Sequence, residues 1–329
     1  MMCGGKGTLL LRQALLFALR AISYKRAARY TRLIFNEKED NVMKKMHIST
    51  PLNLHAYPRT DISEFIRQGL LFNKQAGFDA TDFTVSMLDL TKDDWQAVVE
   101  RAVTDANEIG VPIEVGHLPF IGKGGTKDPE VQRIFSQKMF RAIDAAKLLG
   151  MKYAVMHPNA VTLPMRQYNR REQYDVVMTH LAPFVEYANK VGLQVVVENM
   201  RLVHATVVAH RYCQAADELC EVADALGIGI CWDFGHANIS GLKQSESLAM
   251  IGKRLKVIHV NDNFAGDDTH EPPFMGNVDW KDAMHGLALA GFDGVFNFEA
   301  GAGGIPPSMR ETYAKYLVQA AGELMAMIE

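Results

Sequence analysis

Short apolar runs that end in a histidine or a carboxylate recur along the chain. Imidazole and carboxylate groups bind divalent cations and move protons, so each of these run ends could do chemistry. The run ends are His117 in EVGHLPF, His157 in VMHPNA, Glu198 in VVVENM, Asp233 and His236 in WDFGH, His259 in VIHVND and Glu299 in FNFEA. One such residue alone is usually a hydrogen-bonded structural group. Six successive runs with the same kind of ending indicate a shared site.

Three carboxylates brought together away from water would lose their hydration, at a cost of several kcal/mol per charge, and would also repel one another. A divalent cation relieves that repulsion. Oxygen and nitrogen ligands without a thiolate suit Mn²⁺, Mg²⁺, Co²⁺, Zn²⁺ or Fe²⁺. Cys231 is a poor ligand candidate, because strand alternation places it on the same face as Asp233 but deeper in the interior.

The elements that must position these residues follow one alternating pattern from Met46 onward. We expect strands at 46–50, 81–88, 112–120, 152–158, 194–200, 228–236, 256–263 and 294–300. Helices are expected from about 61, from about 92, at 129–149, 167–190, 213–226 and 242–253, from about 278, and at 308–327. Val/Ile-rich runs are typical of parallel strands that are buried on both faces.

Eight strand–helix units without an internal domain break predict a single (β/α)₈ TIM barrel with an N-terminal extension. An open doubly wound sheet is the alternative, but no G-x-G-x-x-G follows the first strand. In a TIM barrel the C-terminal ends of the strands meet at one mouth, where catalysis is built. The candidate residues should therefore converge there.

The first 42 residues differ in charge from the rest of the chain. They contain eight Lys/Arg and three acids, and residues 43–329 contain 27 basic and 35 acidic residues, a net charge of −8 with histidine neutral. We expect residues 1–42 to be a basic extension outside the native fold, and 43–329 to form the barrel. A targeting segment, an amphipathic surface helix, or translation from upstream of Met43 would each explain the extension.

The composition restricts the compartment and the partners that we expect for the protein. No apolar run reaches the ~18 residues of a membrane span, so no membrane is expected as a partner. The four cysteines form no CxxC pair, which favours reduced thiols in a cytoplasmic protein. The acidic barrel disfavours nucleic acid, whose phosphates need basic partners.

The motifs VENM, DFGH, HVNDN and FEA, in that order on the fifth to eighth strands, resemble those of the xylose isomerase-like superfamily. This superfamily contains sugar and sugar-phosphate isomerases and epimerases, and the endonuclease IV type of DNA repair nuclease. The resemblance implies that one catalytic divalent metal ion (Mn²⁺, Mg²⁺, Co²⁺ or Zn²⁺) is held by Glu198, Asp233, His259 and Glu299. It also implies a small-molecule sugar or sugar phosphate as substrate, and it is compatible with a homo-oligomer.

The loop DDTHEPPFMGNVDW (267–280) extends the resemblance. It predicts Asp268 and His270 above the barrel mouth, where they would join His117, His157 and His236 in binding substrate or a second metal. We interpret Asp279 as a residue at the N-terminus of a helix, favoured there by the helix dipole. GKGGT (122–126) lacks the Walker spacing of a phosphate loop, so a flexible loop at the top of the barrel is the favoured interpretation.

The favoured function is an isomerase or epimerase that transfers a proton through a metal-stabilised enediolate, with Glu198 and Glu299 as the catalytic acid–base pair. The first alternative is a zinc-dependent nuclease for abasic sites, similar to endonuclease IV, whose ligand pattern also includes the additional histidines and Asp268. HPNA and DFGH differ from the corresponding nuclease motifs. Further alternatives are a polyol or keto-acid dehydratase and a non-catalytic barrel that binds a metal or a sugar.

Overall fold

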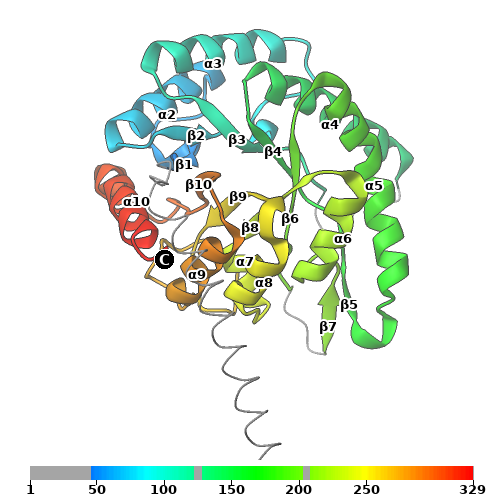
Figure 1. The fold of residues 1–329 in the computed structure, drawn as a ribbon. Helices are drawn as coiled ribbons and strands as arrows, with labels where there is room; N and C mark the ends of the chain where they lie inside the picture. The colour runs from blue at the N-terminus through cyan, green and yellow to red at the C-terminus, as the bar shows by residue number, and fades with distance from the viewer. Residues whose placement is uncertain (1–45, 122–127, 203–207, 329) are drawn as a thin grey trace, which may run out of the picture. The chain divides into compact units, whose positions relative to one another are not determined.

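A computed structural model describes residues 46–121, 128–202 and 208–328 of the chain. Its centre is a closed barrel of eight parallel strands in the order β1-β10-β9-β8-β6-β4-β3-β2 (Figure 1). The strands are β1 Ile48–Pro51, β2 Ala80–Asp82, β3 Ile113–His117, β4 Tyr153–Met156, β6 Val195–Glu198, β8 Gly229–Asp233, β9 Leu255–Val260 and β10 Val295–Phe298. The prediction of a single TIM barrel is confirmed.

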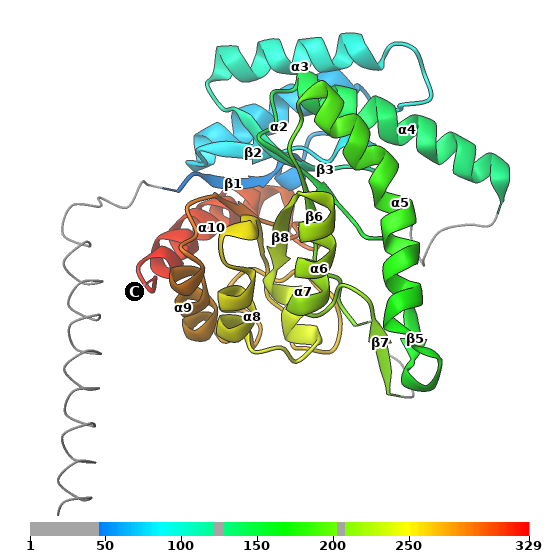
Figure 2. The same cartoon turned by 45° about the vertical axis from the view of Figure 1, so that its right-hand side comes forward.

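Helices surround this barrel in both views (Figures 1 and 2). They are α2 Ile62–Ala76, α3 Trp95–Ile109, α4 Pro129–Leu148, α5 Arg170–Val191, α6 Ala216–Leu226, α8 Gln244–Ile251, α9 Trp280–Ala290 and α10 Arg310–Met325. Side chains expected to begin helices do so: Asp61 accepts the backbone N–H groups of Ser63 and Glu64, and Asp279 accepts that of Asp282. Each bond satisfies a donor that the first turn of a helix leaves free.

The barrel interior is apolar below the mouth. Six side chains, one from each of six strands, pack there into a cluster of their own: Val115, Val155, Val196, Cys231, Val257 and Val295. Two residues farther along β3, β6, β8 and β9 lie His117, Glu198, Asp233 and His259. Because side chains alternate between the two faces of a strand, these polar residues point the same way as the apolar cluster and lie above it. The predicted interior position of Cys231 is confirmed.

Two predicted strands included segments that are helical. β2 ends at Asp82 and a short 3₁₀ helix, Val85–Met87, follows, so 81–88 is not one strand. β8 ends at Asp233, and 234–239 forms the short helix α7 (Phe234–Ile239), because the Asp233 carboxylate accepts the N–H of His236 and begins the helix. His236 is therefore a helical residue and not a strand end.

An antiparallel pair of short strands, β5 (Thr162–Pro164) and β7 (Ala209–Arg211), was not predicted. Both views show the pair beside the lower end of α5 (Figures 1 and 2). It belongs to the segments that follow β4 and β6, on the side of the barrel where the strands end.

The compact unit that contains the barrel comprises Met46–Glu329. The predictions made for residues 1–42 and for GKGGT (122–126) fall outside the described residues. None of the helices in the described part of the chain combines the length and the apolar character that a membrane span requires.

Candidate active site

Four side chains from four strand ends meet at the barrel mouth. A ligand atom from each of His117, Glu198, His259 and Glu299 lies within 4.8 Å of the ligand atoms of the others. His259 Nδ1 is 2.9 Å from Glu198 Oε1 and 3.0 Å from Glu299 Oε2. His117 Nε2 is 3.4 Å from Glu198 Oε2 and 3.8 Å from Glu299 Oε1. We name these four residues the central group.

The central group contains acceptors that the described residues do not satisfy. His259 Nδ1 has one proton to donate, and its hydrogen bond goes to Glu198 Oε1. Glu299 Oε2 and Glu198 Oε2 are buried and accept no well-oriented hydrogen bond within the described ranges, although His157 Nε2 lies 2.9 Å from Glu198 Oε2. Buried carboxylate oxygens need a donor or a cation. A divalent cation fits this set of oxygen and nitrogen donors.

In the central group, the ionisation of each glutamate depends on the charges of the neighbouring imidazoles. Burial alone would raise the pKa of the Glu198 and Glu299 carboxyls. The imidazoles outweigh burial, His259 most of all, and they hold the pKa of both carboxyls below the ordinary range. Both glutamates are therefore ionised at neutral pH, as a proton-accepting group must be.

A second set of ligand-type side chains, His236, Asp268 and His270, lies beside the central group. His236 Nδ1 donates to the backbone carbonyl of Asn199 at 2.8 Å, and His270 Nδ1 donates to that of Glu299 at 2.6 Å. A carbonyl only accepts, so both Nδ1 atoms carry protons and each ring presents Nε2. These Nε2 atoms lie 3.4 and 3.5 Å from Asp268 Oδ2. We name these three residues the upper group.

The upper group favours a positive charge at its centre. Burial opposes protonation of both imidazoles, but the surrounding carboxylates outweigh it and raise the pKa of His236 and of His270 to about 10. Asp233 and Asp268 act most strongly on His236, whereas Asp268 and Glu299 act most strongly on His270. The same arrangement of two nitrogens and a carboxylate would suit a metal ion.

Asp233 is held by the backbone as well as by side chains. Its Oδ1 accepts the N–H of His236 at 2.6 Å, and its Oδ2 accepts Nδ2 of Asn261 at 2.7 Å. Burial and the nearby glutamates raise the pKa of Asp233 to about 7. The residue caps α7, and each oxygen retains a second lone pair, so capping does not exclude metal binding.

The structure divides the predicted ligand set. Glu198, His259 and Glu299 lie in the central group with His117, and Asp233 lies with Glu198 and His236. His236, however, uses Nδ1 to donate to Asn199, so its free nitrogen faces Asp268. The ligand and catalytic roles of these residues remain predictions.

His157 contacts the central group and is partly exposed. Its Nε2 is 2.9 Å from Glu198 Oε2, and burial lowers its pKa. The ring of Phe120 stacks on it, with centroids 4.3 Å apart and planes 21° from parallel. Phe120 is 52% exposed, so it offers an apolar wall at the edge of the site.

Asp262, just beyond the end of β9, organises the loop that carries Asp268 and His270. Its carboxylate accepts four N–H groups at 2.9–3.0 Å, from the backbone of Asn263, Phe274 and Val278 and from the indole of Trp280. Asp262 is fully buried, and its backbone pairs with that of Glu271. The loop is thereby fixed at both of its ends.

Residues of the central and upper groups line a cavity of about 310 Å³. Its lining comprises Thr84, His117, Phe120, Ile121, His157, Asn159, Glu198, Met200, Arg201, Arg211, His236, Asp268, His270 and Glu299. Every residue of the upper group and three of the central group are among them. The site therefore includes a cavity that can hold a small molecule.

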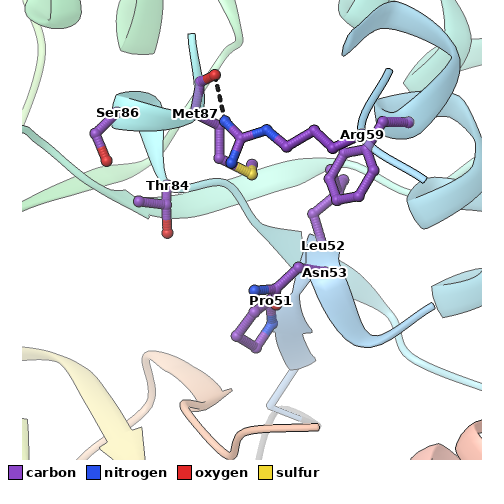
Figure 3. A pocket seen from close by; sticks show the side chains of 8 residues that line it. Pro51, Leu52, Asn53, Arg59, Thr84, Ser86 and Met87 are labelled. Carbon is purple, nitrogen blue, oxygen red and sulfur yellow. Dashed lines mark hydrogen bonds between the residues drawn. The ribbon is translucent and has the colours of Figure 1, made fainter. Parts of the chain in front are cut away.

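A second cavity, of about 260 Å³, lies at the C-terminal ends of β1 and β2 (Figure 3). Arg59 extends across it and donates to the backbone carbonyl of Met87 at 2.5 Å. Thr84 lines this cavity and also the active-site cavity, so the two adjoin at that residue.

A sequence model of the xylose isomerase-like TIM barrel family matches residues 72–319. The chain belongs to this family. The match covers most of the barrel, including both groups and the loop that Asp262 organises. It confirms the resemblance seen in the four strand-end motifs.

Two relatives are similar to parts of the chain. MJ1311, an uncharacterised protein from Methanocaldococcus jannaschii, is 27% identical over 188 residues, 56% of this chain and 63% of that protein. The uncharacterised protein y4fM from Sinorhizobium fredii is 27% identical over 158 residues, 48% of this chain and 50% of that protein. The chain thus spans less than two thirds of either relative.

Solved structures share the fold over nearly their whole length. The 3-keto-D-glucoside 4-epimerase from E. coli has a TM-score of 0.64 at 18% identity, over 84% of this chain and 100% of that one. The D-allulose 3-epimerase from Methylomonas sp. has a TM-score of 0.65 at 15% identity, over 85% and 98%. At these identities the likeness shows the fold alone.

Three polar residues near the site were not anticipated from the sequence. Arg201 and Arg211 line the cavity, and Asp82 is buried at the end of β2 with its Oδ2 accepting Nδ2 of Asn297 at 2.7 Å. Asp82 was missed because the strand was extended to residue 88. Arg201 follows VENM by one residue, which is a usable signal, whereas nothing in the sequence near Arg211 pointed to the site.

Proposed function

We propose that this protein is a divalent-metal-dependent isomerase or epimerase that moves a proton on a small sugar. The observation that carries the proposal is the approach of two carboxylates, Glu198 and Glu299, to one imidazole nitrogen of His259, at 2.9 and 3.0 Å. Both glutamates line a cavity sized for a small molecule. The names of the epimerases that share the fold support the same class of substrate.

The metal ion would be held by the central group, with Asp233 as an additional ligand through its remaining lone pairs. The unsatisfied oxygens of Glu198 and Glu299 support this assignment. When bound, a divalent cation supplies a Lewis acid that polarises the carbonyl and hydroxyl oxygens of a sugar. In the upper group, His236 and His270 would donate to substrate hydroxyls or bind a second ion.

Glu198 and Glu299 would move the proton. One ionised carboxylate accepts the proton from the carbon next to the substrate carbonyl, which leaves an enediolate. Return of a proton to the neighbouring carbon gives isomerisation, and return to the opposite face by the second carboxylate gives epimerisation. The side chain of Glu198 is 1% exposed and that of Glu299 is 24% exposed, so Glu299 is the carboxylate that exchanges its proton with solvent.

The test is a panel of ketoses, free and phosphorylated, incubated in D₂O with Mn²⁺, Co²⁺ or Zn²⁺ and followed by NMR. We expect deuterium at the carbon next to the carbonyl, together with an isomer or an epimer. Metal analysis of the purified protein should find at least one divalent ion per chain. Conversion that continues unchanged after complete metal removal would contradict the proposal.

Hydrolysis of DNA at abasic sites is the second candidate. It is favoured by the upper group, since the endonuclease IV type of pattern uses these additional ligands beside the central ones. A duplex with one abasic site belongs in the same assay. Cleavage of the duplex at low enzyme concentration, with no ketose converted, would replace the isomerase proposal. A keto product formed by loss of water would instead indicate the dehydratase.

A further inference from the structure

Two arginines line the active-site cavity together with the two ligand groups. Arg201 lies three residues beyond Glu198, and Arg211 is the last residue of β7. They reach the cavity from different segments, one after β6 and one from the short antiparallel strand pair. Guanidinium groups bind carboxylates and phosphates through parallel hydrogen bonds.

Arg211 is fixed in place without a carboxylate. Its Nε donates to the carbonyl of Ala160 at 3.0 Å, and one terminal nitrogen lies 3.4 Å from the carbonyl of Arg201. Its backbone N–H donates to Gln214 Oε1 at 2.9 Å. These contacts orient the side chain, yet in the described part of the chain no acid lies within ion-pair distance of it.

That arrangement is unfavourable without an anion. Burial and the neighbouring Arg201 lower the pKa of the Arg211 guanidinium, and Glu198 and Asp268 offset this only in part. Two backbone carbonyls use only part of the five N–H donors of an arginine. Arg211 also lines the cavity, so its remaining donors are available to a bound anion.

Arg201 is paired, but only at one nitrogen. Its Nε lies 3.0 Å from Asp268 Oδ2, an oxygen that both histidines of the upper group also approach. No described residue is bonded to its terminal nitrogens. Arg201 therefore pairs with Asp268 through Nε, and it lines the same cavity as Arg211.

We propose that the substrate carries an anionic group, and that Arg211, assisted by Arg201, binds it. This inference rests on the proposed function only in that the rest of the substrate would lie against Glu198 and Glu299. The shared chemistry is a terminal oxyanion, which a sugar acid supplies as a carboxylate and a sugar ester as a phosphate. The neutral sugars would lack a partner for Arg211.

The test is calorimetric titration of the full chain with inorganic phosphate, D-gluconate and the neutral polyol D-glucitol. Each titration is made with metal-loaded protein and again with EDTA, since phosphate also binds metal ions directly. We expect one or both anions to bind under both conditions, and glucitol to bind at least tenfold more weakly. Binding of phosphate alone would identify a phosphate ester as the source of the oxyanion, and binding of gluconate alone would identify a sugar acid.

Arg211→Gln should weaken anion binding at least tenfold, and Arg211→Lys should weaken it less. The matched control is Arg133→Gln, which removes an exposed guanidinium on α4 that pairs with Glu130. Circular dichroism checks that each variant folds, and the comparison of anions with glucitol needs no variant. Retained binding in Arg211→Gln, binding that disappears with EDTA, or no anion binding at all would overturn the inference.

These outcomes are independent of the isomerase assay. Anion binding that depends on Arg211 would stand even if no ketose were converted. Conversely, turnover of neutral ketoses without anion binding would support the proposed function and reject this inference.

Discussion

His270 donates its Nδ1 proton to the backbone carbonyl of Glu299 at 2.6 Å. A residue of the loop after β9 is thereby bound to the end of β10, and its free Nε2 faces Asp268. A bond of this kind fixes both the tautomer and the orientation of a ligand histidine. The orientation of His270 in the upper group is thus set by the backbone.

Replacement of a histidine in the upper group should weaken the binding of a second metal equivalent per chain. We expect His270→Gln and His236→Gln each to reduce the affinity for that equivalent about 10- to 100-fold, as measured by metal analysis and titration. The control is the exposed His285→Gln. Identical binding of a single equivalent by the wild type and both variants would mean that the upper group binds substrate instead.

Glu198→Gln should abolish turnover while leaving the fold intact. Glutamine has nearly the same shape, but it cannot accept the substrate proton and binds a divalent cation poorly. We expect kcat to fall by about 10²–10⁴, with an unchanged far-UV circular dichroism spectrum. The exposed Glu130→Gln serves as the control. Full activity in Glu198→Gln would exclude this glutamate from proton transfer.

Asp262→Asn should destabilise the barrel and loosen the loop that carries the upper group. Both carboxylate oxygens accept N–H groups, and an amide replaces one of them with a donor that faces other donors. We expect a loss of about 3 kcal/mol in the free energy of unfolding, measured with urea. The exposed Asp293→Asn should change it by less than about 0.5 kcal/mol. An equal effect of the two changes would show that the carboxylate of Asp262 does not stabilise the loop.

His55 should make stability depend on pH. Burial, helped by Arg310, lowers its pKa to about 4, whereas an unfolded histidine titrates near 6.5. Between these values the unfolded chain binds more protons, so the free energy of unfolding falls as the pH is lowered. We expect a contribution of about 1–3 kcal/mol across this window.

The measurement is urea unfolding of wild type and His55→Gln at pH 7, 6 and 5. The variant should lose part of the pH dependence, whatever its stability at pH 7. His285→Gln, at an exposed position, should keep the wild-type slope. Parallel curves for wild type and His55→Gln would refute the assignment.

The alternation of strands and helices was predictable because each element carries its own pattern of apolar residues. Asp61 and Asp279 begin their helices through bonds that span only two or three residues, so the sequence displays them directly. The strand-end residues were also predictable, since parallel strands in a barrel deliver their C-terminal ends to one mouth.

The grouping within the mouth was not predictable. Which ligand atoms approach one another depends on the tilt and stagger of the strands, and these bring His117 to Glu198 while His236 turns toward Asp268. Arg211 was missed because it enters from β7, a strand that a plain barrel does not contain. Asp82 was missed for a simpler reason. The apolar pattern continues beyond the end of β2, so the predicted strand did not end at Asp82.

The six apolar side chains beneath the mouth form an apolar layer under the site. The valines and Cys231 pack between six of the strands, so this part of the barrel interior offers no polar partner to water or hydroxide. On the mouth side, the partly exposed His157 lies 2.9 Å from Glu198 Oε2. Exchange between the site and solvent therefore runs through the mouth, and the more exposed Glu299 is the carboxylate through which deuterium from D₂O would reach the substrate.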